Sequence, residues 1–137
     1  SSNNSDPLRM RFNKSGSAVV STNYVTRTSY AAINTMGSIN TTETHNSWVN
    51  YFELAYNTGG TQANCSIELN IPNPLKSNSR GTFDSTYGGY NQSAIAAFTG
   101  QNGGVLFNNN GAYTGVTIFP ATGTIDSGRF TMYGVKH

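Results

Sequence analysis

Apolar and polar residues alternate in two well-defined segments of the chain, and each segment predicts a β-strand. In residues 8–12 every second residue is apolar, and both positions between them are arginines. In residues 64–71 one set of alternate positions is apolar or cysteine, and the other set is polar. A period of two is typical of a strand that is buried on one face. The expected inward positions are Leu8, Met10 and Phe12 in the first strand, and Cys65, Ile67, Leu69 and Ile71 in the second.

Weaker patterns predict further strands. Residues 79–87 are predicted to form a strand in which Gly81 permits a β-bulge. Residues 48–56 alternate, which places Trp48, Asn50, Phe52, Leu54 and Tyr56 on one face. The remaining expected strands are 94–99, 105–107, 113–119 and 129–135.

The region 18–46 has a less regular pattern. Residues 18–28 contain a strand near 18–20 or near 24–26, and residues 29–33 form either a strand or one helical turn. Residues 34–46 are mostly Thr, Asn, Ser and Gly, so we expect a long exposed loop there.

Turn-forming residues separate the predicted strands. They fall at 13–17, 57–60, 72–74, 102–104, 108–111, 120–123 and 126–128. Several short strands at regular spacing, without a helical period, indicate an all-β fold, either an antiparallel sandwich or a barrel. The residues expected to contribute to its core are Phe12, Trp48, Phe52, Leu54, Ile67, Leu69, Ile71, Ile118, Phe130 and Met132.

The composition agrees with an all-β fold and argues against some classes of binding partner. Asn, Thr, Ser and Gly make up nearly half of the chain, which favours strands joined by polar turns. The eight Tyr, seven Phe and one Trp argue against a disordered chain. Only 10% of the residues are charged, and the net charge of +2 comes from scattered basic residues, so nothing indicates nucleic-acid binding. No apolar run approaches the roughly 18 residues of a membrane-spanning helix.

Residues that often take part in catalysis are few and scattered. His45 lies in the predicted loop and His137 is the last residue, so neither is placed as the base of a hydrolytic triad. Glu53 and Glu68 lie on neighbouring predicted strands but on their polar faces, where solvated carboxylates are more common than an acid–base pair. Cys65 is the only cysteine, and we expect a small buried or half-buried residue. We therefore predict a protein that is not an enzyme and has no metal site and no cofactor.

Tyrosines near flexible glycines are the candidate ligand contacts. Residues 87–91 read Tyr-Gly-Gly-Tyr-Asn, and tyrosine offers a large contact area at low entropic cost. The candidate glycan or ligand contacts are thus Tyr87, Tyr90, Asn91 and Tyr113. The structural alternative is that these tyrosines cover the end of the sandwich.

Three segments resemble jelly-roll-like domains that end many bacteriophage fibre and virion-surface proteins. Residues 115–120 (GVTIFP) and 126–136 (DSGRFTMYGVK) resemble a terminal pattern of an I-x-hydrophobic strand, a glycine-containing turn and S-G-x-F-x-L-Y-G-[IV]-K, with Met132 in place of Leu. Residues 8–13 (LRMRFN) resemble the strand V-x-V-R-F-N of this family, and residues 66–73 (SIELNIPN) resemble its L-E-L-x-I-P-N strand and turn. The order and the approximate spacing of the three segments agree with the family.

The resemblance implies that the antiparallel β-sandwich is jelly-roll-like, and the spacing of the strands and turns predicts seven to nine strands. The length fits one domain, over residues 8–137, and the polar residues 1–7 before it are expected to be a loose segment or linker. Related domains would have one or two strands before the R-F-N strand. We therefore expect either that the chain is part of a longer protein or that another chain covers the open edge.

The resemblance also implies a function at the virion surface. We expect a structural component of a phage virion, namely a tail-fibre, head-fibre or capsid-decoration domain that acts by assembly and surface presentation. Its expected partners are other virion proteins and copies of itself, with a trimer as the natural guess for a fibre, and neither nucleic acid nor a membrane. The alternative is a carbohydrate-binding or host-receptor-binding module that recognises a host surface glycan.

Overall fold

The computed structural model describes residues 7–34, 39–55, 63–72, 74, 80–91, 96–123, 125 and 128–134. Within these residues the chain forms nine β-strands and no helix. The strands are β1 (Leu8–Lys14), β2 (Ser17–Ala18), β3 (Tyr24–Asn34), β4 (Ile39–Val49), β5 (Phe52–Ala55), β6 (Ala63–Asn70), β7 (Arg80–Asn91), β8 (Ala96–Asn110) and β9 (Gly115–Pro120).

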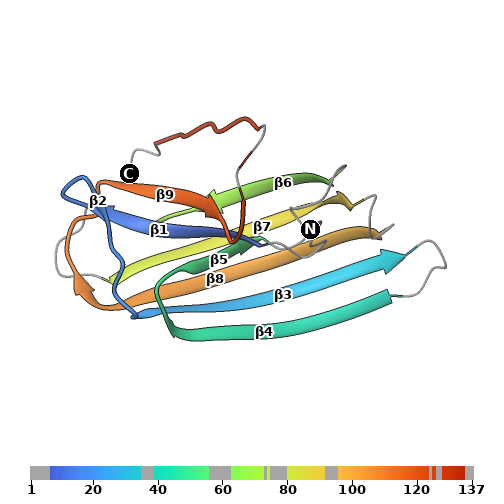
Figure 1. Cartoon of the computed structure of the whole chain (residues 1–137), viewed down its shortest axis with the longest axis horizontal. Helices are drawn as coiled ribbons and strands as arrows, with labels where there is room; N and C mark the ends of the chain where they lie inside the picture. The colour runs from blue at the N-terminus through green and yellow to red at the C-terminus, as the bar shows by residue number, and fades with distance from the viewer. Residues whose placement is uncertain are drawn as a thin grey trace.

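The strands form two antiparallel sheets that pack face to face (Figure 1). The five-stranded sheet has the order β4-β3-β8-β7-β6. In the smaller sheet β1 is central, because it pairs with β9 on one edge and with β2 and β5 on the other. The prediction of an all-β antiparallel sandwich with seven to nine strands is confirmed.

The two clearest alternating patterns are also confirmed. In β1, Met10 and Phe12 are fully buried, and Leu8 packs against the core. The strand ends in a tight turn at Ser15 and Gly16, whose φ values of 53° and 81° suit a two-residue hairpin. In β6 and the residue after it, Cys65, Ile67, Leu69 and Ile71 are half-buried, and Ser66, Glu68 and Asn70 are exposed.

Aromatic rings make up most of the core. The ring centroid of Phe52 lies 5.6 Å from that of Phe12, 4.6 Å from that of Tyr24 and 4.5 Å from that of Phe83. Ring pairs of this kind contribute about 0.5–1.5 kcal/mol each beyond the area that they bury. Of the residues expected in the core, Phe12, Phe52 and Leu54 are buried, and Ile67, Leu69, Ile71 and Ile118 are half-buried against them.

Glycines on the inner face of the five-stranded sheet make room for these rings. A Cβ atom on Gly104 would lie 2.8 Å from the ring of Phe83 and 2.9 Å from the ring of Phe52. A Cβ atom on Gly81 would lie 2.7 Å from the ring of Phe12. The rings can therefore lie against the backbone of the sheet only where no side chain stands beneath them. The bulge expected at Gly81 is confirmed by a register shift between Arg80 and Gly81.

The structure corrects the prediction of a long exposed loop at residues 34–46. Residues 39–49 form β4, which pairs with β3 along the full length of β4. The side chains of Thr41, Glu43 and His45 are exposed, so this edge strand has no apolar alternation to reveal it. Its backbone pairing and the preference of Thr for strands explain why it forms. Residues 35–38 lie outside the described residues.

The structure also corrects the turn predicted at residues 102–104. Residues 96–110 form one continuous strand, β8, instead of two short strands separated by a turn. Gly103 and Gly104 lie in its middle, paired with Arg27 and Thr26 of β3. Glycine at position 104 serves ring packing and not chain reversal, and the sequence pattern does not distinguish these two uses.

Three residues expected in the core are exposed, so their assignment was wrong. Trp48 is 58% exposed, because β4 ends at Val49 and the chain crosses to the smaller sheet before β5 begins at Phe52. Phe130 and Met132 are 65% and 81% exposed. The strand expected at 129–135 does not form within the described residues 128–134, so their apolar side chains have no sheet to pack on. Tyr56 lies outside the described residues.

Replacing Gly104 by Ala should destabilise the fold by about 1–3 kcal/mol, because the added Cβ overlaps two core rings and a carbonyl oxygen of β3. Gly103→Ala is the matched control, since the atom nearest to its new Cβ is a carbonyl oxygen 3.6 Å away, an ordinary contact. Urea denaturation of both variants measures the difference. Equal stability of the two variants would contradict the role given to Gly104.

Candidate functional site

The outer face of the five-stranded sheet is a broad surface of small polar residues. Because neighbouring strands are in register, their outward side chains form rows that cross the sheet. One row runs from β4 to β6 through Glu43, Ser29, Gln101, Thr86 and Glu68, all of them exposed. The next row consists of Thr41, Ala31, Thr99, Gly88 and Ser66.

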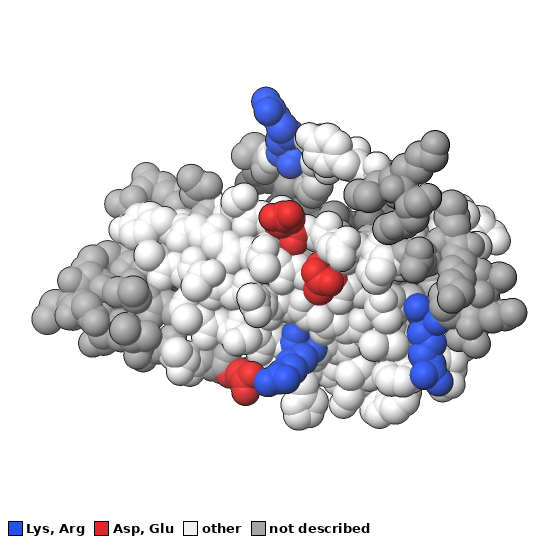
Figure 2. All heavy atoms as spheres, turned by 180° about the vertical axis from the view of Figure 1, so that it is seen from behind, with Lys and Arg blue, Asp and Glu red and all other residues white. Residues whose placement is uncertain are grey.

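Figure 2 shows the molecule from the side opposite to that in Figure 1, and few charged residues lie on this face. Arg27 forms an ion pair with Glu43, and both side chains are exposed, so the pair contributes little to stability. Asp84 accepts a hydrogen bond of 3.4 Å from the side-chain amide of Asn70. The described part of the face has no basic stripe of the kind that binds nucleic acid.

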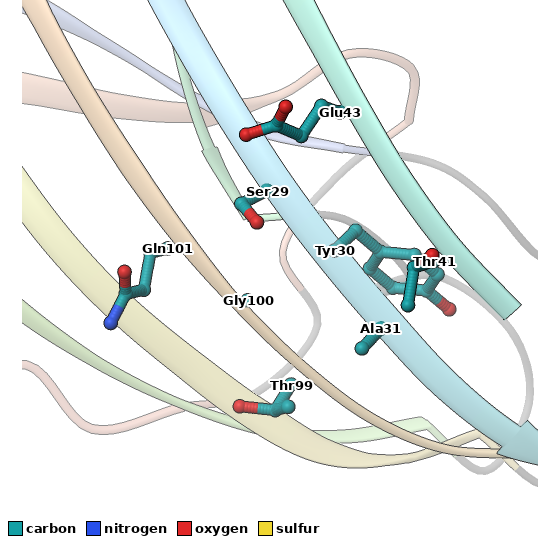
Figure 3. Close-up of a pocket in the computed structure, with 8 residues that line it drawn as sticks. All are labelled: Ser29, Tyr30, Ala31, Thr41, Glu43, Thr99, Gly100 and Gln101. Atoms are coloured by element: carbon teal, nitrogen blue, oxygen red, sulfur yellow. The ribbon is translucent and has the colours of Figure 1, made fainter. Parts of the chain in front are cut away.

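A hollow of about 490 Å³ opens on the sheet where β4, β3 and β8 lie side by side (Figure 3). Its lining offers hydroxyl, amide and carboxylate groups, which can both donate and accept hydrogen bonds. The lining residues are Ser29, Tyr30, Ala31, Thr41, Glu43, Thr99, Gly100 and Gln101. This set supplies hydrogen-bonding groups for a polar ligand, and its one ionisable carboxylate is that of Glu43.

An aromatic cluster with an exposed tryptophan and a half-buried phenylalanine lies at one end of the same face. The ring of Trp48 is tilted by 41° against that of Phe107, with 5.7 Å between the centroids. The guanidinium of Arg80 lies 5.0 Å from the centroid of Phe107. These residues come from β4, β8 and β7, so the cluster crosses most of the sheet. Sequence reasoning missed this site because Trp48 shares the alternation of the buried Phe52 and Leu54.

Two of the four predicted contact residues are buried. Tyr87 and Tyr113 are only 3% and 2% exposed, and both belong to the core. The Tyr113 hydroxyl donates a hydrogen bond to the backbone oxygen of Asn109. The structure thus favours the alternative of a structural role for these two tyrosines, and they cannot contact a surface ligand while the sandwich is intact. Tyr90 is 42% exposed, and its role in binding stays a prediction. The side chain of Asn91 lies outside the described residues.

Glu53 and Glu68 do not come together. Glu68 lies exposed on β6, whereas Glu53 lies on β5 in the other sheet and is buried, which corrects its expected solvated position. One oxygen of the Glu53 carboxylate accepts hydrogen bonds of 3.3 Å from Arg9 and from Asn46. The Arg9 guanidinium also stacks 3.8 Å from the ring centroid of Tyr51. Burial raises the pKa of Glu53 above its ordinary value, although the nearby positive charge of Arg9 opposes this shift.

Two other candidate reactive residues, His45 and Cys65, lie on β4 and β6, the opposite edge strands of the five-stranded sheet. His45 is exposed on β4, and His137 lies outside the described residues. Cys65 is half-buried as expected, and burial raises the pKa of its thiol to about 11, so the reactive thiolate is scarce at neutral pH. Among the described residues, no group of three or more His, Cys, Asp or Glu side chains could hold a metal ion. The described chain also contains no helix of the length and apolarity needed to cross a membrane.

Comparison with known proteins adds no relative: no family model, curated protein or solved structure matches the chain.

Replacing Glu53 by Gln should make the stability of the chain less dependent on pH. Because burial raises the pKa of Glu53, the folded chain holds this proton more tightly than the unfolded chain does. The resulting stabilisation is fully present below the unfolded pKa and is lost as the pH rises through the folded pKa. Urea denaturation between about pH 4 and about pH 8 should therefore show the wild type losing stability relative to Glu53→Gln as the pH rises.

Glu68→Gln is the control, because it removes an exposed carboxylate of the same type. If the two variants show the same pH dependence of unfolding, the assignment to Glu53 is wrong.

Proposed function

We propose that this chain is a non-catalytic structural domain at the surface of a phage virion. It works by assembling with copies of itself and with other virion proteins, and by presenting a stable β surface. The resemblance of three segments to phage fibre and virion-surface domains supports the proposal. Parts of all three segments correspond to regular structure, since residues 8–13 lie in β1, β6 ends at Asn70 just before the I-P-N turn, and residues 115–120 form β9. The terminal strand of the third segment does not form within residues 128–134.

The observation that supports assembly most directly is the exposed apolar segment 128–134. Phe130 and Met132 occupy alternate positions, as in a strand with one apolar face, yet 65% and 81% of their surfaces are exposed. Tyr133 is 84% exposed. The segment lies outside the sandwich beyond β9 (Figure 1). Large apolar side chains exposed in one stretch commonly mark an interaction site.

The sandwich itself offers an edge that such a segment would fit. Among the described strands, β9 pairs only with β1, so its other edge is unpaired. On the same side of the molecule, β6 is the edge strand of the five-stranded sheet, and its inward residues are only half-buried. A strand added beside β9 would place apolar side chains over Ile67 and Leu69. We propose that segment 128–134 of a second copy supplies this strand by β-augmentation.

The chain should therefore associate as its concentration rises, and a charge on the apolar face of the segment should prevent association. Light scattering over a concentration series should give a multiple of the monomer mass for the wild type. The double variant Phe130→Asp, Met132→Asp should remain a monomer, because a charged side chain cannot be buried over β6 without a large desolvation cost.

Thr131→Asp is the matched control, since position 131 is on the opposite face of an extended segment. A wild type that remains monomeric at every concentration would refute the assembly role. Equal association of the double variant would show that a different surface is responsible.

A further inference from the structure

We propose that the aromatic cluster formed by Trp48, Phe107 and Arg80 is a saccharide-binding site. The ring of Trp48 would stack against the C–H face of a sugar, and polar side chains of the same sheet face would bind its hydroxyl groups. This inference goes beyond the proposed assembly role and does not depend on it.

The backbone at Trp48 is arranged to expose the ring. Val49 pairs with Tyr24 and Ser47 pairs with Val25, so Trp48 is an extra residue in a β-bulge. Its φ of 58° lies in the left-handed region, which bulky residues rarely adopt and glycine adopts without cost. Strained backbone is commonly found at functional sites, and bulges often redirect a side chain. A large aromatic residue at this position is therefore costly for the fold and needs a reason.

The ring of Trp48 is also held in place from one side. The neighbouring ring of Phe107 contacts it, and the backbone N–H of Phe107 donates a hydrogen bond of 2.9 Å to the carbonyl oxygen of Asn23. Arg80 in turn lies against Phe107. The contact with Phe107 fixes the orientation of the exposed Trp48 ring. Little conformational entropy of the side chain would therefore be lost when a ligand stacks on it.

The chemistry around the cluster favours a saccharide over other ligands. The row of the face beside the cluster, made of Ser47, Val25, Val105 and Thr82, combines hydroxyl groups with apolar side chains, and the rows farther along the sheet carry mainly hydroxyl and amide groups. Such a surface suits a ligand that presents both C–H faces and many hydroxyls. Few charges are present and they are of both signs, so an electrostatic partner such as nucleic acid is not favoured. A protein partner would need a wider apolar centre than the aromatic cluster and the half-buried Val25 and Val105 provide.

The hollow on the same face extends the proposed site. Glu43, which lines the hollow, lies five residues before Trp48 on β4, a separation of roughly 16 Å at 3.3 Å per residue. A single sugar cannot reach both places. The ligand is therefore an oligosaccharide chain that runs along β4, stacked on Trp48 at one end and hydrogen-bonded to Ser29, Thr41 and Gln101 at the other.

Trp48 is the only tryptophan of the chain, so its fluorescence reports on this site alone. We would titrate the purified full chain with three kinds of probe: neutral hexose, N-acetylhexosamine and uronic-acid oligosaccharides. The expected result is a saturable change in emission with at least one kind, and preference for the uronic acid would assign its carboxylate to Arg80. No change with any of the three would overturn the proposal.

Variants at position 48 separate binding from folding. Calorimetry should show that Trp48→Ala weakens binding of the active probe about tenfold or more, whereas Trp48→Phe should retain part of it. Val20→Ala, which shortens another exposed apolar side chain, is the control. Unchanged binding by Trp48→Ala would show that the ligand binds elsewhere. Loss of binding in Tyr90→Ala but not in Trp48→Ala would show the same.

Trp48→Gly tests the strained backbone. It should bind as poorly as Trp48→Ala but unfold at a higher urea concentration, because glycine fits the left-handed conformation and alanine does not. If Trp48→Gly is the less stable of the two, position 48 is ordinary strand and the backbone argument fails.

Discussion

The rest of this sandwich depends on one constraint, which is the close contact between aromatic rings and the backbone at glycine positions. Gly104 and Gly81 leave the inner face of the five-stranded sheet open, and the rings of Phe52, Phe83 and Phe12 occupy that space. A chain with few long aliphatic residues can thus build a dense core from rings and strands alone. The same constraint removes tyrosines from the surface, because Tyr87 lies against Gly100 in the same way. Exposed aromatic residues are consequently exceptions whose positions are informative.

The sequence predicts those parts of the fold in which one face of a strand is buried and the other face is exposed to solvent. The strands β1 and β6 follow from alternation, and the bulge at Gly81 follows from glycine within a strand pattern. The edge strand β4 could not be predicted, because its exposed Thr, Glu and His residues form no apolar face. Gly103 and Gly104 look like a turn because glycine serves both turns and close packing, and only the rings that pack on Gly104 reveal which applies.

The candidate site could not be predicted, because the direction of one side chain decides it. Alternation places Trp48 with Phe52 and Leu54, but β4 ends at Val49 in one sheet and β5 begins at Phe52 in the other, so the alternation does not continue between them. The proposed binding cluster begins on β4, and the proposed assembly edge is β9, on the β6 side of the sandwich. Because these are opposite sides, copies joined through β9 would leave every tryptophan accessible. Several weak sites on one assembly would then bind a polymeric ligand much more tightly than a single copy does.

The pairing of β1 with β9 has a consequence for how the chain folds. Leu8 pairs with Pro120 and Asn13 with Gly115, so the central strand of the smaller sheet finds its main partner more than one hundred residues later in the chain. Contacts of such long sequence separation slow folding, because the intervening chain loses entropy before the contact forms. During synthesis β1 can pair with β2 and β5 first, but its long edge against β9 stays unpaired until residues 115–120 have been made. The two arginines between its apolar residues keep the strand soluble and resist premature pairing with other chains.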